Sequence, residues 1–214
     1  MRGWFITFEG GEGSGKSTQL AHLARRYHAF GREVVTLREP GGTPIGEEIR
    51  HTLKHSAAGQ AMTPEAELLL MNASRAQIVR QVIRPALAAG KVVLCDRFYD
   101  STTAYQGYGR GLDLGVVKAV IDFAVGPTRP DLTLLLGVAP EVSARRLRAR
   151  QSTLPFVRDR IEEAGNEFFA RVAGGFEAIL AAEPARVTAV DAAGSVEEIA
   201  AAIWALAERR CPPA

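Results

Sequence analysis

The sequence predicts an α/β protein, built as a three-layer α/β/α sandwich around a parallel sheet of about five strands. Short apolar runs rich in Val, Leu and Ile recur along the chain. They are continuous rather than alternating, which is typical of strands that are buried on both faces. Segments of helical character separate these runs, and strands that alternate with helices form right-handed βαβ units in a parallel sheet.

The expected strands and helices follow one another in a regular order. The apolar runs that predict strands are residues 4–8, 33–37, 91–95, 132–138 and 186–190. The segments that predict helices are residues 16–30, 44–53, 64–89, 112–124, 140–150, 160–182 and 195–210. Open sheets of this kind bind ligands beyond the carboxyl ends of their strands. The segments that carry chemistry follow the first three strands, as this rule requires.

The composition is that of a globular protein with a substantial core. Of the 214 residues, 47% are hydrophobic and 23% are charged, and this length suits one domain. The formal net charge of +2 is too balanced for a nucleic-acid-binding protein. No run approaches the roughly 18 apolar residues of a membrane span, and the N-terminus lacks a signal-peptide core. Cys95 and Cys211 suggest neither a disulfide framework nor a metal cluster, so we expect a cytoplasmic protein.

A glycine-rich loop follows the first strand. Residues 10–17 match the pattern G-x-x-x-x-G-K-[ST], in which glycines let several backbone N–H groups converge on a phosphate. The helix that begins at Lys16 adds the positive end of its dipole. We expect Lys16 to reach the β- and γ-phosphates of a nucleoside triphosphate, and Ser17 to ligate Mg²⁺. The residues expected to bind ATP are Gly10, Gly11, Glu12, Gly13, Ser14, Gly15, Lys16, Ser17 and Thr18.

This pattern leaves two questions open. A glycine-rich turn without a ligand is the plain alternative, although a strand before the loop and a helix after it favour a phosphate site. The pattern also does not say which molecule accepts the phosphoryl group, or whether that acceptor is water.

Four further segments place arginines or small polar groups near strand ends. They are residues 38–43 with Arg50 on the following helix, residues 72–77, residues 96–98 and residues 101–107. An arginine that follows a buried strand can present a bidentate fork to a phosphate. Asp96 can hold Mg²⁺ through water. The alternatives are a solvated surface charge for each arginine and a structural ion pair for Asp96 and Arg97.

These segments resemble the thymidylate kinase family, and the likeness runs from residue 4 to about residue 176. It is carried by residues 9–17, 38–43, 74–75, 96–98, 101–107, 129–133 and 159–162. The resemblance implies a P-loop NTPase fold of the nucleoside monophosphate kinase type, with residues 1–214 as a single P-loop kinase domain. It also implies ATP-dependent phosphorylation of dTMP to dTDP with Mg²⁺, and a homodimer.

The resemblance also implies roles for the acceptor side. Glu12 would contact the 3′-hydroxyl, and Arg50 and Arg97 would clamp the 5′-phosphate. Arg75, Thr102 and Gln106 would hydrogen-bond the thymine edge, while Tyr105 would pack near the 2′ carbon. Met71 stands where family members usually carry an aromatic residue that stacks on the base. The Glu39–Pro40 bond would be cis. The whole expected set is Glu12, Glu39, Pro40, Arg50, Met71, Arg75, Arg97, Ser101, Thr102, Tyr105 and Gln106.

A basic run ends the helix expected at 140–150. We expect a mobile lid at about 146–160 that closes over ATP and delivers an arginine to the transferring phosphoryl group. Position 13 is Gly, so the phosphate loop supplies no arginine, and the chain resembles the bacterial type whose catalytic arginines come from the lid. The candidates are Arg146, Arg148 and Arg150, with Arg150 favoured because it is closest to the loop. The plain alternative is a basic helix end that favours the helix dipole.

Catalysis in this hypothesis depends on positioning and charge, through Lys16, Arg97 and the lid arginines. The acceptor phosphate has a second pKa of about 6, so it needs no general base. None of the four histidines falls in a motif, and we expect them at the surface or in packing contacts. Two rivals remain: a kinase for another acceptor, such as dUMP, dCMP or a deoxynucleoside, and a non-catalytic ATP-binding switch or partner-directed ATPase.

Overall fold

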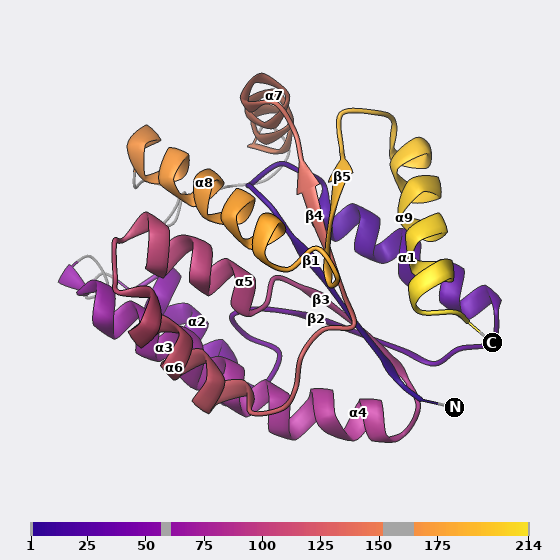
Figure 1. The fold of residues 1–214 in the computed structure, drawn as a ribbon, viewed down its shortest axis with the longest axis horizontal. Helices are drawn as coiled ribbons and strands as arrows, with labels where there is room; N and C mark the ends of the chain where they lie inside the picture. Colours follow the sequence, from indigo (N-terminus) through magenta and orange to yellow (C-terminus); the bar gives the residue numbers. More distant parts are fainter. Residues whose placement is uncertain (1, 57–60, 152–164, 214) are drawn as a thin grey trace.

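Five parallel strands form the sheet of the computed structural model, which describes residues 2–56, 61–151 and 165–213 (Figure 1). The strands are β1 (Trp4–Glu9), β2 (Val34–Arg38), β3 (Val92–Asp96), β4 (Leu132–Gly137) and β5 (Val187–Asp191). Their order is β2-β3-β1-β4-β5, so the strand that precedes the glycine-rich loop lies at the centre. The predicted fold class and all five predicted strands are confirmed.

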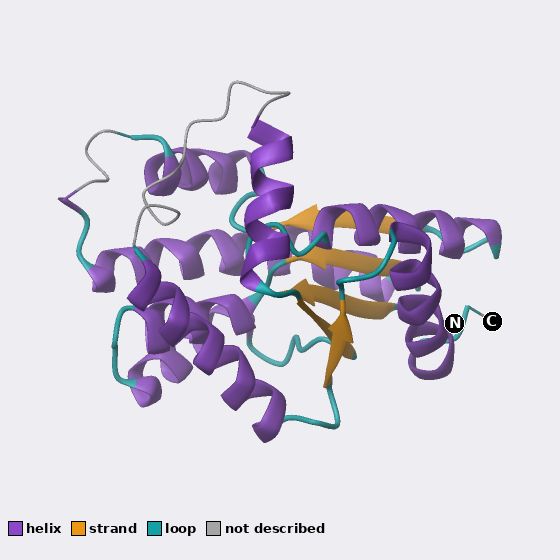
Figure 2. Ribbon diagram, turned by 90° about the horizontal axis from the view of Figure 1, so that it is seen from above, coloured by secondary structure: helices purple, strands orange, loops and turns teal. Residues whose placement is uncertain are grey.

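Helices cover both faces of the sheet (Figures 1 and 2). They are α1 (Lys16–Ala29), α2 (Pro44–Lys54), α3 (Pro64–Ile78), α4 (Arg84–Ala88), α5 (Tyr99–Thr102), α6 (Leu114–Val125), α7 (Pro140–Gln151), α8 (Asn166–Ala182) and α9 (Val196–Arg210), with π-helical η2 (Val79–Ile83) and η3 (Thr103–Gly109). In the described part of the chain, no helix is long and apolar enough to cross a membrane.

The core is divided between the two faces because alternate residues of each strand point to opposite sides. On β1, Ile6 and Phe8 pack with α1 and α9, and both are fully buried. Phe5 faces the other way and packs with α3, η2, α4 and α6. The sheet is therefore the middle of three layers, and the segments that connect strands to helices lie at its carboxyl edge.

The helix predicted at 64–89 is interrupted by a π-helical turn. The Arg84 N–H donates to Val79 O, which is a bond between residues five apart. Pro85 follows directly, and its ring has no N–H and would clash with the carbonyl four residues earlier in an α-helix. The wider turn of η2 accommodates this proline without ending the helix. The helix predicted at 160–182 is described only from Asn166, since residues 152–164 lie outside the described residues.

The helical segment of α5 and η3 was not predicted from the sequence. It contains two glycines and neighbouring threonines, which have poor helix propensity. Packing against α8 compensates for this poor propensity. The contact is close enough to require glycine, because a Cβ at Gly109 would lie 2.6 Å from the Phe168 ring. Arg171 of α8 also donates from Nε to the Gly109 carbonyl at 3.0 Å. Tertiary contact therefore overrides local preference here, and it brings residues 101–106 to the end of the sheet.

The turn after β3 holds Arg97 in a left-handed conformation. Its φ is 70°, and no other described residue besides glycine has a positive φ. The Arg97 N–H donates to Phe8 O at 2.9 Å, which ties the turn to the central strand. A side chain in this region costs on the order of 1 kcal/mol or more relative to glycine. The fold therefore accepts strain to place this guanidinium beyond the sheet.

The strain at Arg97 can be measured by comparing two replacements. Arg97→Gly should have a free energy of unfolding about 1 kcal/mol higher than Arg97→Ala, because only glycine adopts this φ without a steric penalty. Arg25, exposed within α1, is the matched control. There glycine should be the less stable replacement, by about 1 kcal/mol. Urea denaturation of the four variants checks the reversal, and the same sign at both positions would contradict it.

Candidate active site

A cavity of about 690 Å³ opens at the carboxyl edge of the sheet and collects most of the predicted site residues. Its walls come from the glycine-rich loop, the β2–α2 loop, the end of β3 and helices on both faces. The predicted residues that line it are Glu12, Gly13, Ser14, Gly15, Lys16, Ser17, Thr18, Glu39, Pro40, Arg50, Met71, Arg75, Asp96, Arg97, Ser101, Thr102, Tyr105, Gln106 and Arg146.

Four predicted residues do not line this cavity or are not described there. Gly10 and Gly11 do not line it, and their carbonyl groups accept hydrogen bonds from Lys16 Nζ. Arg148 is exposed on α7. The side chain of Arg150, which the sequence favoured among the lid arginines, lies outside the described residues, as does most of the expected lid at 146–160. Of the lid arginines whose side chains the structure describes, Arg146 lines the cavity and Arg148 does not.

The glycine-rich loop curls as the sequence predicted. Gly10 has a φ of 128°, and a Cβ there would lie 2.3 Å from the Leu136 carbonyl of the adjacent strand. Lys16 begins α1, and its Nζ donates back to the Gly11 carbonyl at 2.7 Å. Burial, and then the positive charge of Arg97, lower the pKa of Lys16 to about 8. The loop thus holds a desolvated ammonium group whose charge an anion would stabilise.

Ser17 and Asp96 meet across the loop. Ser17 Oγ donates to Asp96 Oδ2 at 2.5 Å, although the two residues belong to α1 and β3. No group of three His, Cys, Asp or Glu side chains suited to a metal ion occurs among the described residues. A hydroxyl beside one carboxylate is a small set of hard oxygen donors. It suits Mg²⁺, which keeps several waters and takes other ligands from phosphates.

Arg97 links the glycine-rich loop to the opposite wall. Its Nη2 lies 2.7 Å from Glu12 Oε1, its Nη1 donates to Ser101 Oγ at 3.0 Å, and its guanidinium carbon lies 5.1 Å from the centre of the Tyr105 ring. Burial raises the pKa of Glu12, but Arg97 and Lys16 outweigh it and lower the pKa to about 2. Glu12 is therefore ionised, and the pair balances charge at the middle of the cavity.

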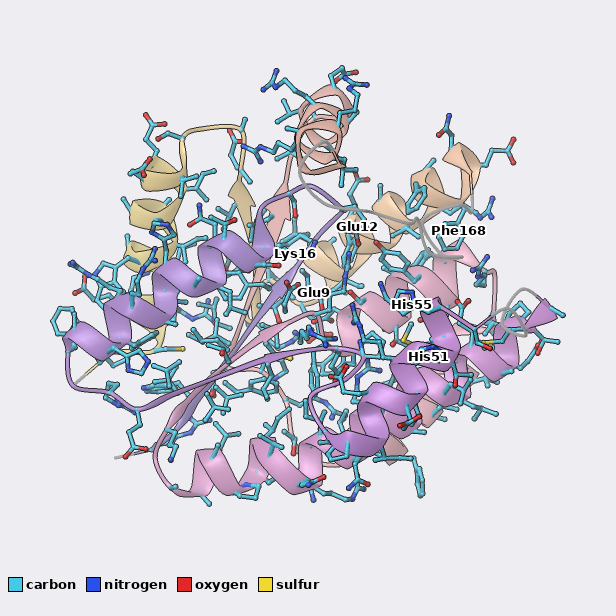
Figure 3. The ribbon with its side chains drawn as sticks, turned by 180° about the vertical axis from the view of Figure 1, so that it is seen from behind. Glu9, Glu12, Lys16, His51, His55 and Phe168 are labelled. Carbon is cyan, nitrogen blue, oxygen red and sulfur yellow. The ribbon has the colours of Figure 1, made fainter. Side chains whose placement is uncertain are left out.

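Glu9 lies beneath this pair at the end of β1. The side chain is fully buried, and it accepts hydrogen bonds from the Phe98 N–H at 2.7 Å and from Ser101 Oγ at 2.5 Å. Burial, and then the nearby charge of Asp100, raise the pKa of Glu9 to about 7. Figure 3 shows Glu9, Glu12 and Lys16 gathered around the start of α1. Glu9 therefore ties α5 to the central strand rather than facing the cavity.

Arg75 is buried among acceptors on two helices and two loops. Its Nε donates to Glu39 Oε2 at 2.8 Å, and its Nη1 donates to Asn72 Oδ1 at 3.0 Å and to Thr102 Oγ1 at 2.8 Å. Its Nη2 donates to the Phe98 carbonyl at 3.2 Å. Burial raises the pKa of Glu39, and Arg75 opposes this shift. The predicted proximity of Arg75 and Thr102 is present, and Arg75 is held rigidly.

The loop after β2 brings Arg50 to the same wall. The Glu39–Pro40 peptide bond is cis, as the resemblance implied. The Gly41 N–H donates to Ser74 Oγ at 3.1 Å, which fixes the loop to α3. Arg50 then donates from α2 to the Pro40 carbonyl at 2.9 Å. The loop geometry therefore aims a second guanidinium into the cavity.

Helix α7 rests on the glycine-rich loop. Ser143 Oγ donates to the Glu12 carbonyl at 2.6 Å, and a Cβ at Gly13 would lie 2.9 Å from the Ser143 carbonyl. Glycine at position 13 therefore lets α7 approach closely. One turn later, Arg146 lines the cavity beside Gly15. The basic helix end thus supplies a cation at the loop.

Several residues that line the cavity were not predicted. His55 is exposed, as expected, and it also lines the cavity, as does Lys54. Phe169 of α8 and Val196 and Ile199 of α9 add apolar surface. No local signal marks these residues, because helices far along the chain carry them. Phe169 in particular adds an aromatic ring to the cavity that Met71 also lines.

Comparison with known proteins agrees with this geometry. Residues 8–203 match the family model described as "Thymidylate kinase". A thymidylate kinase of Synechococcus sp. (strain JA-3-3Ab) is 50% identical over 206 residues, which cover 96% of each chain. One of Pseudomonas fluorescens (strain Pf0-1) is 50% identical over 192 residues, covering 90% of this chain and 89% of the relative.

A solved structure extends the agreement to the fold. The crystal structure of thymidylate kinase from Ehrlichia chaffeensis has a TM-score of 0.77 and 31% sequence identity, and it covers 97% of this chain and 99% of that chain. The likeness therefore extends over the whole fold and is not limited to a shared motif. This chain belongs to the thymidylate kinase family.

Proposed function

We propose that the protein transfers the γ-phosphoryl group of ATP to dTMP, giving ADP and dTDP. The observation that carries this proposal is the contact between Arg97 Nη2 and Glu12 Oε1 at 2.7 Å. It places the arginine of the acceptor wall directly against the glycine-rich loop. Two nucleotides bound on either side would then present their phosphates to each other in one cavity, which is the requirement for direct transfer.

The transfer itself needs charge neutralisation rather than a proton acceptor. An oxygen of the dTMP phosphate attacks the γ-phosphorus, and the bond from that phosphorus to the β-phosphate oxygen breaks. The acceptor oxygen is already anionic near neutral pH, because the second pKa of a phosphate monoester is about 6. Lys16, Arg97 and Arg146 supply cations around the moving group. Their positions on α1, the β3 turn and α7 surround the site from three sides.

The acceptor wall has groups suited to each part of dTMP. Arg50 and Arg97 would clamp the 5′-phosphate, and Glu12 would accept from the 3′-hydroxyl. Tyr105 would pack against the sugar. Ser101 would support Arg97, whose Nη1 already donates to it at 3.0 Å.

The base would lie against the remaining wall, which has both polar and apolar groups. Arg75, Thr102 and Gln106 would hydrogen-bond the thymine edge. The Met71 thioether would lie on a ring face. Phe169 lines the same cavity and would provide the aromatic surface that position 71 lacks.

Mg²⁺ fits the residues at the loop. Ser17 Oγ and the Asp96 carboxylate, 2.5 Å apart, would hold it directly and through water. When bound, it would neutralise charge on the triphosphate and orient it. ATP and Mg²⁺ are thus the cosubstrate and metal that we propose.

The identity of the acceptor can be tested with a panel. Steady-state turnover with dTMP, dUMP, dCMP and thymidine should be highest for dTMP, because the wall pairs arginines for a 5′-phosphate with a base-reading edge. A deoxynucleoside lacks the phosphate that Arg50 and Arg97 would bind. Thymidine as the best acceptor would overturn the proposal. A protein that does not bind dTMP beside a non-hydrolysable ATP analogue would instead be a switch or an ATPase.

The lid arginines differ in position, which makes them testable as a matched set. Arg146→Ala should lower kcat by about 100-fold or more, since Arg146 lines the cavity, whereas Arg148→Ala should change it by less than about fivefold. Arg150→Ala belongs in the same series, because the sequence favoured it. Steady-state turnover at saturating ATP and dTMP gives the measurement. Equal losses for Arg146 and Arg148 would show that both act during closure.

We also propose a homodimer formed through α3 and α6. Leu69, Val116 and Phe123 are 59%, 56% and 84% exposed, and Val116 and Phe123 lie seven residues apart, on one face of α6. Phe123→Glu should therefore convert the dimer to a monomer in sedimentation experiments. Arg209→Glu, at an exposed position of α9, is the control and should leave the dimer intact. A monomeric unmodified protein would end this proposal.

The expected cytoplasmic location stays a proposal as well. Cys95 and Cys211 are both buried and unpaired, which is the state that a reducing compartment favours. Fractionation of cells that express the protein would check this location.

A further inference from the structure

The amide of Gln106 is held in one orientation by a carboxylate behind it. Gln106 is 1% exposed and lines the cavity, and its Nε2 donates to Glu67 Oε1 at 2.7 Å. A carboxylate only accepts hydrogen bonds, so the NH₂ group must face Glu67. Among the described residues none donates to Gln106 Oε1. The carbonyl oxygen is therefore the group that Gln106 presents to the cavity.

Arg110 keeps Glu67 in the form that imposes this orientation. Glu67 is fully buried on α3, and Arg110 grips both of its oxygens, with Nε 3.2 Å from Oε1 and Nη2 3.0 Å from Oε2. The Arg110 guanidinium also lies over the Phe168 ring, with its carbon 4.6 Å from the ring centre. A buried carboxylate with a bidentate cationic partner favours the ionised state. An ionised Glu67 cannot donate to Gln106, so the amide cannot turn around.

We propose that Glu67 and Arg110 are positioning residues that set the pyrimidine selectivity of the site through Gln106. The inference rests on the proposed function, in which Gln106 meets the Watson–Crick edge of the acceptor base. Thymine carries a hydrogen on N3 and can donate it to Gln106 Oε1. Cytosine has a lone pair on N3, which would face the lone pairs of that oxygen. Cytosine would thus leave two buried acceptors opposed and unpaired.

Uracil provides an internal control for this mechanism. Uracil and thymine have the same N3–H donor and the same O4 acceptor, and they differ only in the methyl group. Fixing the Gln106 amide therefore separates dTMP from dCMP but contributes nothing to the choice between dTMP and dUMP. A general weakening of the wall would affect all three acceptors together.

The test replaces the carboxylate with its isosteric amide. In Glu67→Gln the new NH₂ group can donate to Gln106 Oε1, which allows the Gln106 amide to turn and present Nε2 to the cavity. The dTMP-to-dCMP ratio of kcat/KM should fall about tenfold or more, while the dTMP-to-dUMP ratio should change less than about twofold. Glu65→Gln, at an exposed site in the same helical turn, should alter neither ratio.

Calorimetric binding of the three monophosphates supplies a second measurement, which does not depend on turnover. An unchanged dTMP-to-dCMP ratio in folded Glu67→Gln, or an equal loss with all three acceptors, would overturn the inference. If that variant does not fold, Arg110→Lys takes its place, since lysine keeps the charge but loses the fork, and the same ratio should fall. If the unmodified protein does not use dTMP, the proposed function itself is wrong. That result is distinct from one in which only the selectivity of Glu67→Gln fails to change.

Discussion

The ion pair between Arg97 and Glu12 holds the two halves of the cavity together. Arg97 follows β3 on the acceptor wall, and Glu12 lies in the glycine-rich loop, yet their charged atoms are 2.7 Å apart. Burial, and then the nearby charge of Arg97, lower the pKa of Lys16 to about 8, so the two cations repel each other. Glu12 offsets this repulsion. Bound phosphates would supply more negative charge and strengthen the same arrangement.

This arrangement depends on a strained backbone turn and on a buried carboxyl group. Arg97 has a φ of 70°, which a side chain rarely adopts, and Glu9 below it is buried with its pKa raised to about 7. Neither feature favours stability, because the first strains the backbone and the second buries a carboxyl group. Each feature is explained by the contact that it makes possible. The turn directs Arg97 to Glu12, and Glu9 fixes the start of α5 by accepting a hydrogen bond from the Phe98 N–H. Strain of this kind commonly marks functional sites.

The sequence was sufficient for features that depend on neighbours along the chain. The strands, the phosphate loop and the approximate helix positions follow from periodicity and from glycine spacing. The family resemblance added the residues expected on the acceptor side, all of which line the cavity. Features that depend on distant segments were not predictable. The helix of α5 and η3 exists because α8 packs on Gly109, and His55 and Phe169 reach the cavity only through the placement of whole helices.

Two ion pairs with buried carboxylates lie behind the wall that we propose reads the base, and neither is explained by stability. Arg75 pairs with Glu39 and Arg110 pairs with Glu67, although a buried pair often contributes no more stability than apolar residues would. Each pair instead fixes a polar group that faces the cavity. Arg75 donates to Thr102, and Glu67 fixes the Gln106 amide. A neutral amide or hydroxyl can turn to suit either of two bases, and a charged partner on its far side prevents this. In the proposed function, the charges of the site would thus act twice: on the phosphates at the strand ends, and on the orientation of the polar groups behind the base.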